Sequence, residues 1–182
     1  MRVFLDFEAS SLSRDSYPIE VGWAAEDGST EQHLIRPGPG WTDWDPSAEA
    51  IHHITPDKLN AEGEPHDVVA RRVLKALGHH QVYVTAPSWD GMWLSKLLRA
   101  SGLPRHALRM QDAEEAHVAA ALEILGGDPA DPWARATALD LLRDARHGLA
   151  FAPPVHRALA DALQELAVFL EVQRLARERS PT

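Results

Sequence analysis

Three observations predict an α/β fold with a mixed sheet. The first part of the chain contains short runs of alternating apolar residues separated by turn residues, which is typical of an antiparallel meander. The rest alternates between amphipathic helical segments and short strands, which indicates parallel strands joined by helices. The length of 182 residues, with 45% hydrophobic and 25% charged residues, suits one globular domain. We therefore predict five strands, an antiparallel edge and helices on both faces.

Period-two alternation defines the three strands of the meander. Residues 1–8 (MRVFLDFE) and 17–25 (YPIEVGWAA) alternate in this way. The turn dipeptide Asp27-Gly28 then predicts a hairpin to a third strand over residues 30–36. Apolar runs at residues 81–85 and 107–111 supply the fourth and fifth strands.

Apolar residues at spacings of three and four predict the helices, several of which end at a glycine. The first predicted helix is short and has Ser47 as its N-cap. The others span residues 65–78, 89–100, 114–125, 133–146 and 155–177. The sequence Ala152-Pro153-Pro154 predicts an extended approach to the last helix. We expect a single domain over residues 1–178 and a frayed tail over 179–182.

Composition excludes several classes of protein. The chain has no cysteine, so disulfides, zinc–thiolate sites and a cysteine nucleophile are excluded. No apolar run approaches membrane-spanning length, and the N-terminus resembles neither a secretory signal nor a transit peptide, so we expect a cytoplasmic protein. The net charge of −9 argues against broad attraction to nucleic acid, but a metal site carries its own positive charge.

The first strand carries two acids at its end. Asp6 and Glu8 lie on the same face by the period-two rule, and two such carboxylates repel one another unless a cation lies between them. Hard divalent cations take oxygen ligands, so the pair is a candidate metal site. The alternative is an exposed strand end with solvated acids. The same spacing recurs at Asp112 and Glu114, so spacing alone does not decide.

Two further segments offer chemistry. Asp90 follows the buried strand at residues 81–85 and stands near the start of a helix, where an acid is also favoured by the helix dipole alone. His156 and Asp161 stand at the beginning of the last predicted helix. The alternative there is a surface histidine and a solvated acid. His52 and Asp57 have the same spacing, but Pro56 interrupts them, so we interpret them as structural.

Taken together, these segments resemble the DEDDh group of 3′–5′ exonucleases, which includes proofreading exonuclease subunits, ribonuclease T and oligoribonuclease. The resemblance rests on the early Asp-x-Glu strand, the middle strand followed by Asp90, and the late His156-Arg157-Ala158-Leu159-Ala160-Asp161 motif. The segment Ile51-His52-His53-Ile54-Thr55 is also similar to the family's Ile-His-Gly-Ile-Thr segment. The resemblance spans nearly the whole chain and implies a ribonuclease H-like fold.

The resemblance also implies an activity and a ligand set. Asp6, Glu8, Asp90 and Asp161 would hold two divalent cations, Mg²⁺ or Mn²⁺, and His156 would take the proton from the attacking water. The expected reaction is hydrolysis of phosphodiester bonds at the 3′ end of single-stranded DNA or RNA, with release of 5′ mononucleotides.

The residues that would contact the substrate are less well matched. Leu12 corresponds to a family leucine that wedges against terminal bases, although it also suits an ordinary core. Ser10 and Ser11 replace the family's usual threonine and glycine. Ala86 and Trp89 replace its asparagine and its phenylalanine or tyrosine. For Trp89 and Trp93 the two interpretations are a stacking surface for bases and a place in the core. For Arg143, Arg146 and Arg157 they are a contact with substrate phosphate and a solvated helix face.

Two other functions remain open at this point. One is a non-catalytic module that binds nucleic-acid ends, against which the complete set of four carboxylates and a histidine argues. The other is a phosphohydrolase acting on dinucleotides or short oligonucleotides, which the acidic net charge favours. Dimers occur among the small members of the resembling family, so a homodimer is a further expectation.

Overall fold

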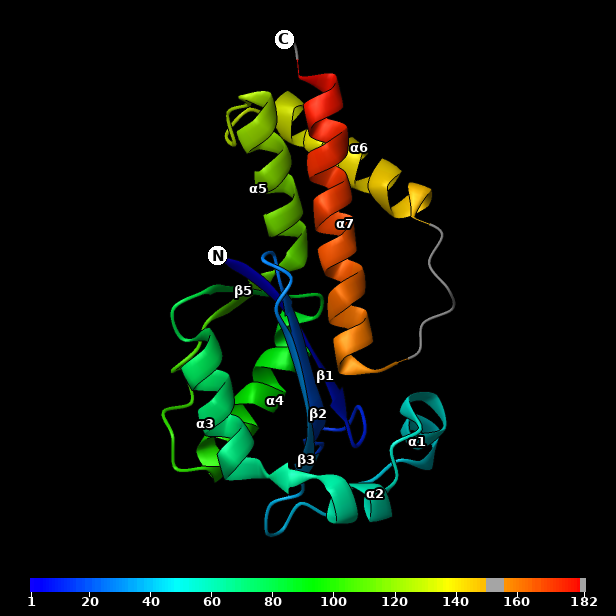
Figure 1. The fold of residues 1–182 in the computed structure, drawn as a ribbon. Helices are drawn as coiled ribbons and strands as arrows, with labels where there is room; N and C mark the ends of the chain where they lie inside the picture. The colour runs from blue at the N-terminus through cyan, green and yellow to red at the C-terminus, as the bar shows by residue number, and fades with distance from the viewer. Residues whose placement is uncertain (150–155, 181–182) are drawn as a thin grey trace.

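The computed structural model describes residues 1–149 and 156–180. Its centre is a mixed sheet of six strands in the order β4-β3-β2-β1-β5-β6 (Figure 1). The strands β1 (Arg2–Ala9), β2 (Pro18–Ala25) and β3 (Thr30–Arg36) form the predicted antiparallel meander. Gly28 in the second hairpin turn has a φ of 87°, a conformation in which a side chain would be strained. The meander is therefore confirmed.

The remaining strands add to the meander in parallel. β5 (Gln81–Val84) pairs with β1, and β6 (Met110–Asp112) pairs with β5. β6 begins three residues later than predicted. A short strand, β4 (Glu64–Pro65), pairs with β3, so the sheet has six strands and not five. Two residues carry no alternation, and only their pairing with β3 makes them a strand.

The helices follow the predicted order, with corrected ends. Those of the described residues are α1 (Pro46–His52), α2 (Pro56–Glu62), α3 (His66–Leu77), α4 (Pro87–Ala100), α5 (Ala113–Leu125), α6 (Pro132–Gly148) and α7 (Ala158–Arg179). The sequence did not indicate α2. Ser47 as the cap of α1 was wrong: the carboxylate of Asp45 accepts the N–H of Ser47 at 2.8 Å, and Pro46 occupies the first turn.

The start of the last helix also differs from the prediction. α7 begins at Ala158 and not near residue 155, and the predicted extended segment at residues 152–154 lies outside the described residues. At the other end, α7 continues to Arg179, whose guanidinium pairs with Asp144 of α6 at 2.8 Å.

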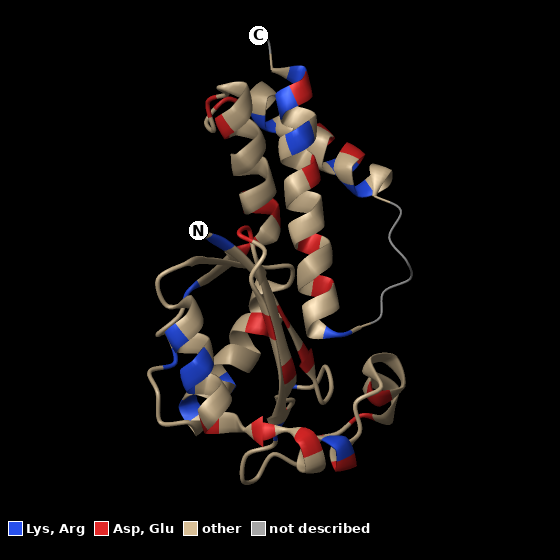
Figure 2. Cartoon of the chain, in the orientation of Figure 1, with Lys and Arg blue, Asp and Glu red and all other residues tan. Residues whose placement is uncertain are grey.

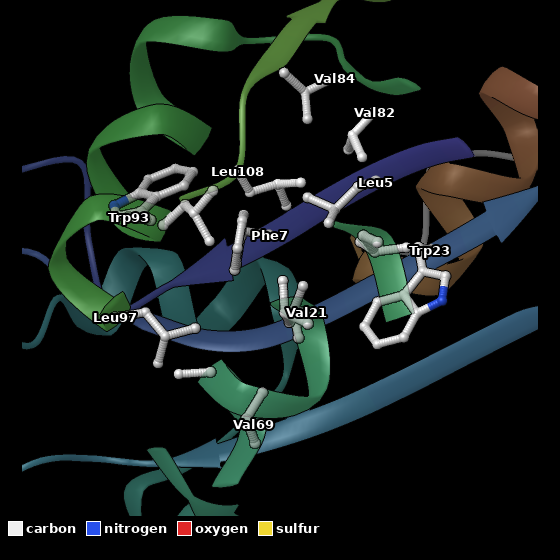
Figure 3. Close-up of a cluster of buried hydrophobic side chains, with 14 of the residues drawn as sticks. Leu5, Phe7, Val21, Trp23, Val69, Val82, Val84, Trp93, Leu97 and Leu108 are labelled. Carbon is white, nitrogen blue, oxygen red and sulfur yellow. The ribbon is translucent and has the colours of Figure 1, made fainter. Parts of the chain in front are cut away.

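Helices cover both faces of the sheet, as expected. On one face, Val69 of α3 and Leu97 of α4 pack with large apolar side chains of the central strands, including Leu5, Phe7 and Val21 (Figure 3). On the other face, α5 and α7 pack against Phe4 and Tyr83 largely through alanines, with Leu166 and Phe169 of α7 as the larger side chains among them. The alanines allow these two helices to lie close to the strands.

The ends of α5 and α7 extend beyond the sheet and are packed with α6 (Figure 1). Their shared core includes Val118, Leu141, Leu142 and Val172. Within residues 1–149 and 156–180, none of the helices combines the length and apolar character needed to cross a bilayer.

Candidate metal centre

Alternation along β1 separates its apolar and acidic side chains onto opposite faces. Leu5 and Phe7 enter the core under α3 and α4 (Figure 3). Phe4 packs with Phe169 of α7, so Asp6 and Glu8, two and four residues further on, face the α7 side. The acids therefore lie on the covered inner strand of the sheet, where burial makes their charged forms unfavourable.

Gly22 on β2 allows α7 to reach these acids. It is the register partner of Asp6. A Cβ atom at Gly22 would lie 2.3 Å from the backbone nitrogen of Leu159, well inside any tolerated contact. Only the missing side chain lets the first turn of α7 rest directly on the strand. This contact places Asp161, in that first turn, over β1.

Three carboxylates converge at this point. Asp6, Glu8 and Asp161 each offer an oxygen within 4.8 Å of the others. A cavity of about 210 Å³, lined by Asp6, Asp161, Thr85 and Glu165 among others, adjoins them. Close, partly buried acids with oxygen donors only are the ligand set that Mg²⁺ and Mn²⁺ prefer. These three predicted ligands are thus brought together.

Burial and mutual repulsion raise the pKa values of these carboxyl groups. Burial, followed by the charges of Asp90, Glu8 and Asp161, raises the pKa of Asp6 well above its ordinary value. Burial and then the charges of Asp161 and Glu20 raise the pKa of Glu8 to about 8. Burial also raises the pKa of Asp161. A cation among these groups would offset the cost of keeping them ionised.

Asp90 lies in the first turn of α4 and is 1% exposed. One of its carboxylate oxygens accepts the N–H of Ala86 at 3.2 Å. Burial raises its pKa to about 7, against the opposing effect of the N–H groups of Ala86 and Phe7. Asp90 is outside the three-carboxylate group, but its charge raises the pKa of Asp6, so it lies beside that group.

His156 immediately precedes the N-cap of α7, as predicted. It has a φ of 48°, a left-handed conformation that is uncommon for a residue other than glycine. Its charge lowers the pKa of Asp161, so the imidazole lies on the same side as the carboxylate group. An imidazole at the rim of an acidic site suits a proton acceptor.

Glu20 is a part of this region that sequence reasoning missed. It is fully buried on β2, opposite Glu8. Its carboxylate accepts hydrogen bonds from Arg157 at 2.9 Å, from Gln32 at 2.8 Å and from the backbone N–H of Ala158 at 3.0 Å. Glu20 thereby fastens the start of α7 to the sheet. Its signal in the sequence was a single acid within the otherwise uncharged strand at residues 18–25.

Arg157 is therefore directed at Glu20, with which it forms an ion pair. The side chain keeps 31% exposure. Its predicted contact with substrate phosphate stays a prediction, and the contact that the structure gives it stabilises the loop that carries His156.

Ser10 and Ser11 are buried, and their hydroxyl groups hold the loop after β1. Both donate to one carboxylate oxygen of Asp43, at 3.3 Å and 2.5 Å. Ser13 donates to the other oxygen at 3.0 Å. The backbone between these serines carries Leu12, whose side chain is 72% exposed. Leu12 is thus no core residue, and its exposure leaves it available to a ligand.

The two tryptophans divide between the two interpretations. Trp93 is buried, and its indole N–H donates to the hydroxyl of Ser16 at 2.9 Å, so it is core. Trp89 is half-buried and stacks on Trp93 with ring centroids 5.7 Å apart. Only Trp89 keeps a surface free for stacking.

The second Asp-x-Glu pair and the second His-x4-Asp pair have structural roles, as does Arg143. Asp112 caps α5 by accepting the N–H of Glu114 at 2.9 Å. His52 is buried and accepts the N–H of Ile54 at 3.0 Å. Arg143 pairs with Asp140 on its own helix, at 2.9 Å.

The fold and the acidic site together define a ribonuclease H-like α/β protein with a cluster of carboxylates at the centre of its sheet. No protein-family model and no curated protein sequence matches the chain. Solved structures do match it. A zinc-bound complex of Escherichia coli exonuclease I with single-stranded DNA aligns with a TM-score of 0.66 and 17% identity, over 98% of this chain and 41% of that chain.

A complex of the same E. coli enzyme with a dA16 oligonucleotide gives a TM-score of 0.66, 16% identity and the same coverage. A further structure of exonuclease I aligns with a TM-score of 0.67 and 16% sequence identity. The chain thus spans about two fifths of these exonuclease I chains. The likeness confirms the predicted ribonuclease H-like fold.

Proposed function

We propose that the chain is a metal-dependent 3′–5′ exonuclease that acts on single-stranded nucleic acid. The observation that carries this proposal is the convergence of Asp6, Glu8 and Asp161 within 4.8 Å, with Asp90 beside them. Such a group has no structural use of its own, because buried carboxylates that repel one another destabilise a fold. The likeness to exonuclease I supports the proposal.

In this proposal Asp6, Glu8, Asp90 and Asp161 would hold two divalent cations. Divalent cations bound there supply positive charge for the substrate phosphate and acidity for a water molecule. His156 takes the proton of that water, and Glu20 holds the loop that presents His156 and Asp161. Leu12 and Trp89 contact the terminal bases, and the products are 5′ mononucleotides.

The proposal is tested with single-stranded DNA and RNA labelled at the 5′ end. With Mg²⁺ or Mn²⁺ we expect a ladder that shortens stepwise from the 3′ end and disappears in chelator. Asp6→Asn should lower the rate by on the order of 10³-fold or more, as the loss of a group that stabilises transition-state charge does. A wild-type protein that is inert on both strands with either metal contradicts the proposal.

Two variants separate the roles of the residues. His156→Ala should retain Mn²⁺ binding, measured by calorimetry, and lose most of its rate, because it removes a proton acceptor and no ligand. Glu8→Gln should weaken Mn²⁺ binding and lower the rate, because it removes a proposed ligand. Its matched control is Glu114→Gln, because Glu114 belongs to the Asp-x-Glu repeat that caps α5. We expect full activity for the control. Unchanged turnover of His156→Ala rejects its role as the base.

The alternative functions are separated by the same assay. A dinucleotide phosphohydrolase hydrolyses dinucleotides faster than longer strands, whereas an exonuclease on polymers shows the opposite order. A non-catalytic end-binding module binds the strands without shortening them at any metal concentration.

A further inference from the structure

A basic stretch follows the acidic site in the sequence. From Gly91 to Gln111 the chain has no Asp or Glu, although its net charge is −9. The same stretch contains Lys96, Arg99, Arg105 and Arg109. Figure 2 shows Lys and Arg on the side of α3 and α4, as well as on α6 and the far end of α7, while Asp and Glu lie along the strands and α7. The stretch from Gly91 to Gln111 is thus a local basic region in an acidic protein.

The stretch forms a continuous surface over α4 and the segment that follows it. One hollow of about 500 Å³ is lined by Arg14, Lys96 and Arg99, together with Trp41. A second hollow of about 500 Å³ is lined by Arg105, His106 and Arg109. Ser95 lines both hollows, so they adjoin along the outer side of α4. We call Arg14, Arg99, Arg105 and Arg109 the basic face.

The arginines of the basic face lack acidic partners. Each of the four is exposed, and among the described residues none forms an ion pair with Asp or Glu. Arginines elsewhere are mostly paired: Arg2, Arg71, Arg72, Arg135, Arg143, Arg157, Arg174 and Arg179. Grouped cations without acids favour an external anion.

Lys96 has a structural role beneath this surface. Its ammonium donates to the carbonyl oxygens of Asp15 and Ser16, the latter at 2.8 Å. It also lies 5.8 Å from the ring centroids of Tyr17 and Trp41. Lys96 thus fixes the loop after β1 against α4, which leaves the four arginines for a ligand.

The basic face begins at the edge of the candidate metal centre. Pro87 and Gly91, in the first turns of α4 beside Asp90, line the hollow that leads to Arg105 and Arg109. Apart from its two neighbours and the backbone of its own helix, no atom lies within 4 Å of the place where a Cβ of Gly91 would stand, so the surface at Gly91 is open. Arg14 follows the exposed Leu12 by two residues. The inference requires a bound strand to pass from the carboxylates over the first turns of α4 to these arginines.

We propose that the basic face binds the sugar–phosphate backbone of a single-stranded nucleic acid outside the catalytic site. This inference rests on the proposed function and makes the substrate a polymer rather than a dinucleotide. Arginine suits the task because its planar guanidinium binds phosphate oxygens in pairs. The half-buried Trp41, which stacks on Tyr17 with ring centroids 5.2 Å apart, lines the same hollow as Arg14 and Arg99.

The experiment measures strand binding and dinucleotide hydrolysis separately. Two double variants, R14Q/R99Q and R105Q/R109Q, each remove two charges from the basic face. The matched control is R36Q/R177Q, because these arginines also form no ion pair within the described residues and lie on β3 and α7. Binding of a labelled strand of about 20 nucleotides is followed by fluorescence anisotropy in chelator across a salt series, and melting temperatures verify folding.

Each double variant should bind the strand about 10-fold more weakly than the wild type. Because each lost phosphate contact lowers the slope of log K against log salt by about 0.7, the loss of two contacts should lower it by about 1.4. Dinucleotide hydrolysis with Mn²⁺ should be unchanged, as should strand binding by the control. Wild-type affinity in both double variants, or equal weakening in the control, overturns the inference. A wild-type protein that binds strands through these arginines but cleaves nothing overturns the proposed function and leaves the basic face standing.

Discussion

The two faces of the central sheet use neighbouring residues of β1 for opposite purposes. Leu5 and Phe7 enter an apolar core under α3 and α4, which holds the sheet together (Figure 3). Asp6 and Glu8 face α7 and meet other carboxylates, whose repulsion raises their pKa values. One face thus contributes stability, and the other loses some of it to the repulsion among its buried carboxylates. This difference is a reason, independent of any other protein, to propose the α7 side as the functional face.

The largest expected effect compares two adjacent residues. Leu5→Ala should lower the free energy of unfolding by about 2–5 kcal/mol, because it opens a cavity in a core where Leu5 is 2% exposed. Asp6→Asn should instead raise the melting temperature in chelator, because it removes a charge that three neighbouring acids oppose. Urea and thermal unfolding in chelator measure both. Comparable destabilisation by the two variants would remove the distinction between the faces.

Substitutions of Glu20 test whether one acid on the α7 side of the sheet stabilises the fold. Glu20→Ala should lower the free energy of unfolding by about 2–3 kcal/mol, less than a fully buried pair because Arg157 is partly exposed. It should also lower kcat more than KM, since it releases the start of α7. Glu20→Gln keeps one carbonyl oxygen that can accept from Ala158 or from Gln32, and it should recover part of both losses. A loss of stability with unchanged kcat would confine Glu20 to the fold.

His117 makes the α7 face sensitive to acid. It is fully buried between Phe4 and Phe169, and burial lowers its pKa to about 4 from an ordinary 6.5. Between these values the unfolded chain binds the proton that the folded protein excludes, so stability should fall by on the order of 2 kcal/mol as the pH drops from about 6.5 to about 4.

The charged groups that face His117 are Glu165, Arg146 and Asp112. Burial raises the pKa of Glu165, which gives the opposite dependence: its contribution to stability is lost as the pH rises. His117→Phe removes the imidazole and keeps the aromatic packing, so its melting temperature should vary less than that of the wild type between pH 6.5 and 4. An identical pH profile in both proteins would contradict the assignment.

The smallest effect on stability is expected at Leu12. Its side chain is 72% exposed, so Leu12→Ala should change the free energy of unfolding by less than about 0.5 kcal/mol. KM for single strands should nevertheless rise, because the apolar surface offered to terminal bases is lost. Leu170→Ala, on an exposed part of α7, is the control and should leave KM unchanged. Equal KM values in the two variants would make Leu12 an ordinary surface residue.

Patterns within a few residues of one another were predictable. Alternation along residues 1–8 placed Asp6 and Glu8 opposite Leu5 and Phe7, and spacings of three and four located most helices to within a few residues. α2 and β4 escaped prediction. α2 is a seven-residue helix that begins at Pro56, and β4 exists only through its pairing with β3. Short elements carry too few residues for a period to appear.

By itself, the sequence determined which residue types stand on which face of β1, and the chain order of Asp6, Asp90, His156 and Asp161. The tertiary structure alone decided which of them meet. α7 reaches Asp6 because Gly22, more than a hundred residues earlier, has no side chain to hold it away. Contacts over such separations depend on packing, and no local period encodes packing. The same reason hid the anchoring of Arg157 by Glu20 and of Ser10 and Ser11 by Asp43.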